Sequence, residues 1–434
     1  MSENRHTRRD FIKTSAAVSA AAVVGLPTHA HAAGSDIIKV GMIGCGGRCT
    51  GAGSDAMDAD PGVRIVAMGD LFMNRVKSSR ETLKGHRAGQ VTVDDDHCFV
   101  GLDCYKKVID SCDVVLIACA AKFHPMYLKA AVEAGKHVFV EKPHAIDPPG
   151  IRVVDEACAL AKQKKVSVQS GLHSRWDAGY RETIQRVNDG QIGEIVAMEE
   201  NFIREPYMGT ASPREGMTEL QWQYSLQYRF AWLCGDDVTQ SLVHNLDRAT
   251  WVMQGAVPER CHGLGGRASA YLMSWVCGDV FDHHSVVYHY PNGVRMYAFC
   301  RTEVGCYNEN SSIILGSKGK AFPLACSMRI GRDEWRYTGP RPNPYKVEHE
   351  VFFKAIRNNE PINAGDYMAK STMVAIMGQL SCYSGKQVTW DQVTKSNFYL
   401  GPRPEECTWD MEPPVKPDAN GVYPVRIPGK TVAI

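Results

Sequence analysis

The chain has 434 residues, a formal net charge of +1 and no block of basic residues. This balance argues against a nucleic acid or an anionic membrane surface as its partner. The length is enough for two domains of ordinary size. The 15 cysteines show none of the C-x-x-C pairs of a zinc or redox motif, so we assign no metal and interpret most cysteines as core residues.

The first 33 residues are predicted to be a twin-arginine export signal that lies outside the fold. Arg8 and Arg9 precede a short alanine-rich apolar run at 16–26, and Ala30-His31-Ala32 is typical of a cleavage site. The run is too short for a spanning anchor, and we expect no membrane span in the mature chain. That chain should work in the periplasm or in another compartment outside the cytoplasm.

The segment IKVGMIGCGG at 38–47 is typical of an apolar strand that runs into a glycine-rich turn and then a helix. Such a turn lets backbone N–H groups bind a pyrophosphate at the helix N-terminus. The pattern G-x-G-x-x-G would use Gly44 and Gly46, with Cys49 in place of the third glycine. Asp70 ends the next strand, 26 residues after Gly44, close to the spacing of an acid that binds the adenosine ribose. The acid would repel a 2′-phosphate, so the prediction is NAD rather than NADP.

From residue 37 to about 168, short apolar strands alternate with amphipathic helices. After the first two strands, the predicted strands are 114–118, 137–140 and 166–168, and the predicted helices include 125–134 and 150–164. This alternation predicts an α/β domain with a doubly wound parallel sheet, whose ligands bind at the carboxyl ends of the strands. We therefore expect a dinucleotide-binding domain over 34–168.

After residue 169 the pattern changes to longer strands with fewer helices between them. The predicted helices are 179–188, 239–253 and 368–383, and the predicted strands are 194–202, 285–290, 294–302 and 311–315. Pro291-Asn292-Gly293 is typical of a hairpin turn. These elements predict an antiparallel α+β domain over 169–434, with an extended arm from Pro402 onward.

Two charged groups could carry chemistry in this framework. Glu141-Lys142-Pro143 follows the strand 137–140 at the carboxyl edge of the sheet. A lysine beside a cationic nicotinamide should have a lowered pKa, which suits a proton acceptor; the alternative is a solvated turn. His244 precedes Asp247 by three residues on one helix face, so the carboxylate could orient the imidazole; the alternative is a core histidine with a structural aspartate.

Other candidates lie nearby in the sequence. His173 and Arg175 follow the strand 166–168 and could bind sugar hydroxyls or the cofactor amide, although a structural role is nearly as plausible. An aromatic-rich segment precedes the His244 helix and could stack on a pyranose ring or belong to the core; it contains Trp222, Tyr224, Tyr228 and Trp232. We expect Asp236 or Asp237 to cap that helix.

Together these motifs resemble the Gfo/Idh/MocA oxidoreductases, named after glucose–fructose oxidoreductase and inositol dehydrogenase. The resemblance is carried by VGMIGCGGR at 40–48, Asp70, VFVEKP at 138–143, GLHSRWD at 171–177, GQIGEI at 190–195 and HNLDRATWVMQG at 244–255, in the family's order. It implies a Rossmann domain and a C-terminal domain with a large open sheet that often forms an oligomer interface. We therefore expect a homo-oligomer, a dimer or a tetramer.

The resemblance also implies that Lys142 and His244 flank the nicotinamide and act on a substrate hydroxyl. Family members often carry an aspartate four residues before the histidine, where this chain has Gln240, so Asp247 or Lys142 would have to serve instead. The expected catalytic residues are Lys142, His244 and Asp247, and the expected substrate contacts are His173, Arg175, Gln240 and Tyr228. The expected cofactor contacts are Gly44, Gly46, Gly47, Arg48, Asp70, Cys119, His124, Glu141 and Lys142.

The function favoured by these features is oxidation of a secondary hydroxyl of a sugar or glycoside by bound NAD. An exported enzyme cannot draw on the cytosolic NAD pool, so the cofactor should be held tightly and regenerated within each cycle. The alternative is an NAD-dependent glycosidase that works by transient oxidation, elimination and re-reduction. A non-enzymatic sugar- or nucleotide-binding protein is the least favoured hypothesis.

Overall fold

The computed structural model describes residues 36–206, 216–268 and 278–434, so the expected export signal at 1–33 lies outside the described residues. The first sheet has six parallel strands in the order β3-β2-β1-β4-β5-β6. Its strands are β1 (Ile38–Ile43), β2 (Val63–Asp70), β3 (Cys98–Val100), β4 (Val114–Ile117), β5 (His137–Val140) and β6 (Val168–Ser170). This is the order of a doubly wound dinucleotide-binding sheet, which confirms the predicted class.

The helices between these strands cover the first sheet, which is why its strands are apolar. They are α2 (Gly47–Ala59), α3 (Met73–Arg87), α4 (Cys104–Asp110), α5 (His124–Glu133) and α6 (Pro148–Lys164). All four residues of β4 are buried, as expected for a parallel strand covered on both faces. The strand predicted at 166–168 lies two residues later, so the carboxyl edge of the sheet extends to Ser170.

The second sheet has nine strands in the described residues, in the order β14-β13-β12-β11-β7-β10-β9-β8-β15. Its strands are β7 (Ile195–Arg204), β8 (Arg260–Gly266), β9 (His283–His289), β10 (Arg295–Thr302), β11 (Glu309–Gly316), β12 (Gly319–Phe322), β13 (Ser327–Ile330), β14 (Asp333–Arg336) and β15 (Val388–Thr389). Only the β7–β10 pair is parallel among these neighbours, so the predicted mostly antiparallel sheet is confirmed.

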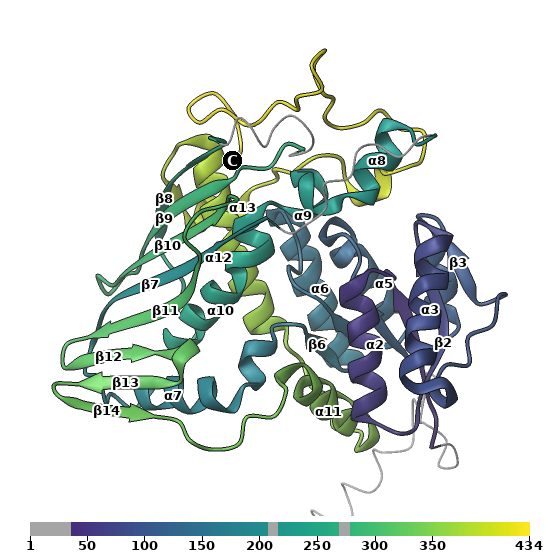
Figure 1. Ribbon diagram of the computed structural model, residues 1–434, viewed down its shortest axis with the longest axis horizontal. Helices are drawn as coiled ribbons and strands as arrows, with labels where there is room; N and C mark the ends of the chain where they lie inside the picture. The colour runs from purple at the N-terminus through teal and green to yellow at the C-terminus, as the bar shows by residue number, and fades with distance from the viewer. Residues whose placement is uncertain (1–35, 207–215, 269–277) are drawn as a thin grey trace, which may run out of the picture. The chain divides into compact units, whose positions relative to one another are not determined.

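Helices α10 (Val243–Val252) and α12 (Gly365–Ser384) lie between the two sheets (Figure 1). Strand β9 alternates buried and half-exposed residues, because its inner face packs on α12 while its outer face does not. The predicted helix 239–253 instead consists of a π-helical turn at Val238–Leu242 followed by α10. The remaining α-helices are α7 (Ala178–Asn188), α8 (Glu219–Ser225), α9 (Ala231–Cys234), α11 (Pro344–Arg357) and α13 (Trp390–Lys395). None of the described helices combines the length and hydropathy needed to cross a membrane.

Helix α11 returns from the second half of the chain to the first sheet. Phe352, Phe353 and Ile356 share one buried apolar cluster with Val40 and Met42 of β1. The helix packs against α2, the helix that follows the glycine turn. Residues 37–434 therefore pack as one unit, and the division of the chain at residue 168 stays a prediction.

Truncation of Phe352 tests whether α11 completes this core. The side chain is fully buried, so Phe352→Ala should lower the free energy of unfolding by about 3–5 kcal/mol. Urea denaturation followed by circular dichroism measures the change. The control is Lys354→Ala, an exposed position on the same helix, which should cost little. Equal small losses in both variants would show that α11 contributes little to the core.

Candidate active site

The glycine turn between β1 and α2 leaves open space beside Gly46 and Gly47, which carry no side chain. Gly44 has φ +93°, and a Cβ there would lie 2.7 Å from the main-chain oxygen of Ala118, so only glycine fits. A Cβ at Gly46 or Gly47 would meet nothing within 4 Å. The first N–H groups of a helix lack partners within the helix. The turn therefore has the open, donor-lined cradle that a pyrophosphate requires.

Asp70 lies beside this turn at the end of β2, where the spacing predicts it. Its Oδ2 accepts a hydrogen bond from the N–H of Cys45 at 2.7 Å, and its Oδ1 accepts one from the N–H of Phe72 at 3.0 Å. The carboxylate thus ties the glycine turn to the end of β2, a structural role that the sequence did not reveal. Each oxygen has a second lone pair, so a ribose hydroxyl can still be bound.

Arg48 in the first turn of α2 is held by acidic partners. Its Nε lies 3.0 Å from Oε1 of Glu141, and its Nη2 donates to Oδ2 of Asp55 at 2.9 Å. Its guanidinium also lies over the ring of Tyr345, 4.8 Å from the centroid. Burial raises the pKa of Glu141, and the charge of Arg48 opposes that rise. The ion pair joins the glycine turn to the loop after β5.

Lys142 follows Glu141 at the carboxyl end of β5 and reaches across to the π-helical turn. Its Nζ donates a hydrogen bond to the main-chain oxygen of Gln240 at 2.7 Å. Burial lowers the pKa of Lys142, while the carboxylates of Glu141 and Asp237 oppose that change. The lowered pKa agrees with the expectation, but here it arises from loss of water rather than from a neighbouring cofactor.

Two imidazoles lie close to this lysine. His173, in the turn after β6, meets His244 of α10 edge to face, with ring centroids 5.0 Å apart. His173 also stacks on Tyr345 of α11, at 4.1 Å between centroids. Burial lowers the pKa of His173 to about 3 and that of His244 well below 6.5, and the charge of Lys142 contributes to both shifts. Both rings are therefore neutral at physiological pH.

The expectation that Asp247 orients His244 is wrong. The Asp247 carboxylate is fully buried and accepts hydrogen bonds from Nε and Nη2 of Arg175 at 2.8–3.1 Å, and from Oγ of Ser371 at 2.7 Å. A bidentate guanidinium is the strongest partner that a buried carboxylate can take. Nδ1 of His244, by contrast, is buried without a hydrogen-bond partner among the described residues.

The same ion pair engages part of the Arg175 side chain. Its Nε and Nη2 bind Asp247, and its guanidinium lies over the ring of Tyr367, 4.1 Å from the centroid. The side chain therefore braces the turn after β6 against α10 and α12, and the expected substrate contact of Arg175 stays a prediction.

A small cleft gathers most of the other expected residues. Its lining includes Arg48, Cys119, His124, Glu141, Lys142, Gln227, Tyr228 and Gln240. The ring nitrogens of His124 lie 2.8 Å and 3.2 Å from the main-chain oxygens of Pro143 and Cys119, so this histidine ties together the loops after β4 and β5. Burial lowers the pKa of His124 to about 4. Tyr228 is the most open of these residues, with 45% of its surface exposed.

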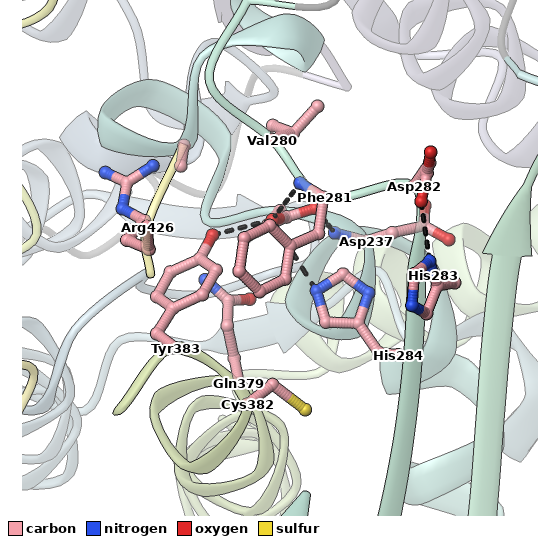
Figure 2. A network of polar contacts seen from close by, with 12 residues as sticks. Asp237, Val280, Phe281, Asp282, His283, His284, Gln379, Cys382, Tyr383 and Arg426 are labelled. Atoms are coloured by element: carbon pink, nitrogen blue, oxygen red, sulfur yellow. Dashed lines mark hydrogen bonds and ion pairs between the residues drawn. The ribbon is translucent and has the colours of Figure 1, made fainter. Parts of the chain in front are cut away.

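A buried network fixes the turn that leads to His244 (Figure 2). Asp236 has φ +84°, a conformation that few non-glycine residues adopt. Its Oδ2 accepts hydrogen bonds from the Tyr383 hydroxyl at 2.6 Å and the N–H of Phe281 at 2.9 Å, and its Oδ1 accepts one from the N–H of Asp237 at 2.6 Å. The network anchors the start of the π-helical turn to α12 and to the strand region before β9.

The expectation that Asp236 or Asp237 caps the following helix is therefore wrong. The carboxylate of Asp237 accepts hydrogen bonds from Nη2 of Arg204 at 2.6 Å and from Oγ of Ser241 at 2.7 Å, and no side-chain cap is formed. π-Helical turns are frequent at functional sites. Here the turn carries Gln240, whose main-chain oxygen receives the hydrogen bond of Lys142.

Three contributors to the site were not assigned from the sequence. Tyr345 lies some 200 positions after Lys142, in a helix that carries none of the quoted motifs. Arg204 lies two residues beyond the predicted strand 194–202, at the observed end of β7. Gln227 neighbours Tyr228 within the aromatic-rich segment, which was the one signal that could have indicated it.

A six-stranded Rossmann sheet with an open glycine cradle, followed by a second sheet, is the architecture of dinucleotide-binding proteins. Residues 38–172 match the family described as "Oxidoreductase family, NAD-binding Rossmann fold", and residues 5–25 match the twin-arginine translocation signal. This match covers the first sheet and agrees with the resemblance to the Gfo/Idh/MocA oxidoreductases seen in the sequence.

Curated relatives match only part of the chain. An uncharacterized oxidoreductase, YhhX, of Escherichia coli is 33% identical over 115 residues, which are 26% of this chain and 32% of the relative. An inositol 2-dehydrogenase of Serratia proteamaculans is 29% identical over 192 residues, 44% of this chain and 47% of the relative. The chain thus spans about a third to a half of the length of these relatives.

Solved structures match the fold over a larger share of the chain. An aldose-aldose oxidoreductase of Caulobacter crescentus has a TM-score of 0.63 at 19% identity, covering 81% of this chain and 99% of that one. A myo-inositol 2-dehydrogenase of Lactobacillus plantarum has a TM-score of 0.60 at 22% identity, with 81% and 99% covered. At these identities the likeness establishes the two-sheet architecture.

Substitution of Gly46 tests the cradle. Gly46→Ala adds a methyl group where the protein has open space, at φ −77°, so the fold should tolerate it. The same methyl group would fill the position of a pyrophosphate, and we expect NAD affinity to fall by roughly 10-fold or more. Isothermal titration calorimetry measures binding, and thermal unfolding without ligand measures stability.

Gly44→Ala is the matched comparison for that experiment. It forces a Cβ against the Ala118 carbonyl at positive φ, so it should lower the unfolding temperature, unlike Gly46→Ala. Unchanged NAD affinity in Gly46→Ala would exclude the glycine turn as the pyrophosphate site.

Proposed function

We propose that this protein is an NAD-dependent oxidoreductase that acts on a secondary hydroxyl of a sugar, sugar alcohol or glycoside. The observation that carries the proposal is that Lys142 lines a cleft with Arg48 of the glycine turn, while its charge acts on the paired rings of His173 and His244. Relatives and fold neighbours named as inositol dehydrogenases and an aldose-aldose oxidoreductase support a polyhydroxylated substrate.

The residues present fit NAD. Its pyrophosphate would lie at Gly46 and Gly47, and its adenosine ribose at Asp70, whose negative charge favours NAD over NADP. When bound, NAD supplies a nicotinamide ring that accepts or returns a hydride. Glu141, paired with Arg48, and the loop residues Cys119 and His124 would form the wall around it.

Lys142 is the proton acceptor in this proposal. Burial lowers its pKa, so a larger fraction of the amine is neutral than in an exposed lysine, which suits a general base. The hydrogen bond to the Gln240 oxygen holds the amine in place. Gln240 itself has no ionisable group, and Asp247 is occupied by Arg175, so neither carries the proton.

The neutral histidines bind and orient the substrate. Nδ1 of His244 has no partner in the described part of the chain, so it is available to a hydroxyl group. Stacking on Tyr345 fixes the ring of His173 against that of His244. Tyr228 and Gln240 line the cleft that contains Lys142 and are further candidates for sugar contacts.

The export signal favours a second candidate function, an NAD-dependent glycosidase. Oxidation beside the glycosidic carbon acidifies a C–H bond, the leaving group is eliminated, water adds, and the returned hydride restores NAD. This cycle needs no electron acceptor outside the cytoplasm. A simple oxidoreductase in the periplasm or a similar compartment must instead pass the hydride to a second carbonyl substrate before the next turnover.

Assembly through the second sheet completes the proposal. The outer face of this sheet carries partly or largely exposed side chains, among them Leu264, which is 74% exposed. A homodimer or tetramer that pairs these faces would cover them.

Removal of Lys142 tests its role. Lys142→Ala should lower turnover by about 10²–10⁴-fold, the usual contribution of a general base, while NAD affinity stays within a few-fold of wild type. Steady-state kinetics and calorimetry measure the two quantities. The control is Lys395→Ala, a lysine whose side chain is 74% exposed on α13. Undiminished turnover in Lys142→Ala would remove the lysine from the mechanism.

The pH profile gives a separate prediction. The base is active when neutral, so the rate of hydroxyl oxidation should rise with pH and level off above the pKa of Lys142. Burial lowers that pKa, so the inflection should lie below the ordinary lysine value of 10.5. The rate of the Lys142→Ala variant should not show this rise with pH. A wild-type rate that falls as pH rises through this range would contradict a neutral lysine as the acceptor.

Product analysis separates the two candidate functions. Purified protein is incubated with free sugars, inositols and aryl glycosides, and the products are identified by mass spectrometry. An oxidoreductase should form a carbonyl product and reduce bound NAD, or depend on an added ketose. A glycosidase should release the aglycone with no added acceptor and no net change in NAD. Wild-type protein that retains NAD but transforms none of these compounds would contradict both.

A further inference from the structure

The C-terminal arm that begins at Pro402 is fixed on the protein beside helix α8 (Figure 1). The side-chain amide of Gln223 in α8 donates a hydrogen bond to the main-chain oxygen of Val415 at 2.6 Å. The hydroxyl of Tyr224 donates one to the main-chain oxygen of Thr408 at 3.4 Å. Cys407 of the arm is buried. The arm and α8 therefore form one layer, called here the strap, made of residues 219–229 and 402–415.

Trp409 places this strap on the two loops that frame Asp70. Its ring meets that of Phe72 edge to face, with centroids 5.9 Å apart, and a Cβ at Gly101 would lie 3.9 Å from its Nε1. The N–H of Phe72 donates a hydrogen bond to Oδ1 of Asp70 at 3.0 Å, and the N–H of Gly101 donates one to the main-chain oxygen of Asp70 at 3.1 Å. Trp409 thus touches both loops bonded to the acid that would hold the adenosine ribose.

The aromatic pair is only partly covered by the protein. Trp409 and Phe72 are both half-buried, although each packs on neighbouring residues. The indole N–H of Trp409 has no acceptor within the described ranges. A purine stacks favourably on aromatic rings. A partly exposed aromatic pair beside a ribose-binding acid is a suitable wall for adenine.

The other end of the strap reaches the substrate cleft. Nη2 of Arg75 in α3 donates to the main-chain oxygen of Ser225 at 2.7 Å, which ties the end of α8 to the helix after Asp70. Two residues later, Gln227 and Tyr228 line the cleft that contains Lys142. The strap therefore runs from the proposed adenosine end of the site to its chemical end.

We propose that the strap closes the dinucleotide site, with Trp409 and Phe72 forming the outer wall of the adenosine subsite. The inference rests on the proposed NAD cofactor and adds the means by which the protein retains it. Release of the dinucleotide would require Trp409 and α8 to leave the loops at Phe72 and Gly101, so dissociation should be slow. Slow release is what a cofactor regenerated within each cycle requires.

Variants of Trp409 test the wall. The dissociation rate of NAD is measured by displacement with excess ligand, and AMP and nicotinamide mononucleotide are titrated as half-cofactor probes. Trp409→Ala should speed NAD dissociation and weaken AMP binding, each by roughly 10-fold, because stacking is lost. Binding of nicotinamide mononucleotide should not change. Trp409→Phe should keep most of the slow NAD dissociation and of the AMP affinity of wild type, because an aromatic ring remains. The control is Trp335→Ala in β14, a tryptophan that packs on Arg186.

A second variant keeps the test decisive if Trp409→Ala lowers stability. Arg75→Ala removes the bond to the Ser225 oxygen and the guanidinium that lies over the Phe72 ring, 5.1 Å from its centroid, so NAD should dissociate several-fold faster. Equal NAD dissociation from wild type, Trp409→Ala and Arg75→Ala would overturn the strap and leave the proposed function intact. Wild-type protein that binds no NAD would overturn the proposed function itself, and this inference with it.

Discussion

The hydrogen bond from Nζ of Lys142 to the main-chain oxygen of Gln240 is the contact on which the site depends. Lys142 belongs to the edge of the parallel sheet, and Gln240 belongs to the π-helical turn before α10. One bond therefore joins the proposed cofactor half to the proposed substrate half. Because the amine is removed from water to make it, the same contact that fixes the geometry also lowers the pKa of the lysine.

The acceptor side of that bond is held in place from behind. The buried carboxylate of Asp236 accepts hydrogen bonds from Tyr383, Phe281 and Asp237 (Figure 2). The backbone of Asp236 has a positive φ. Such a conformation persists only where the surroundings determine it strongly. The network thus fixes where the π-helical turn starts, and so where the Gln240 oxygen and the ring of His244 lie.

Local sequence patterns predicted the parts of this protein that local physics decides. The glycine turn, the strand ending at Asp70 and the helix stopped by Gly385 each follow from residues close in sequence. Local patterns gave the wrong role where a residue distant in sequence is the actual bonding partner. Asp247 lies within one turn of His244, yet it pairs with Arg175, which is 72 positions away. The strands β12, β13 and β14 are only four residues each, too short for a two-residue period to stand out.

The same limit applies to the role of each candidate residue. Sequence spacing placed Asp70 correctly but could not show that its carboxylate also holds the N–H of Cys45. It placed Arg175 at the sheet edge but could not show that its Nε and Nη2 bind Asp247. Trp409 was part of an arm described only as extended, since nothing in its neighbourhood indicates the loop at Phe72 that it contacts.

The charges around Lys142 explain why burial prevails there. Two carboxylates, those of Glu141 and Asp237, raise the pKa of the lysine, and an exposed amine between two such groups would stay protonated. Each carboxylate, however, has its own arginine: Arg48 lies 3.0 Å from Glu141, and Arg204 lies 2.6 Å from Asp237. The paired arginines cancel much of the attraction that would keep the proton on Lys142, so the loss of hydration decides the outcome. A basic amine whose charge acts on two neutral imidazoles is a consequence of these two ion pairs.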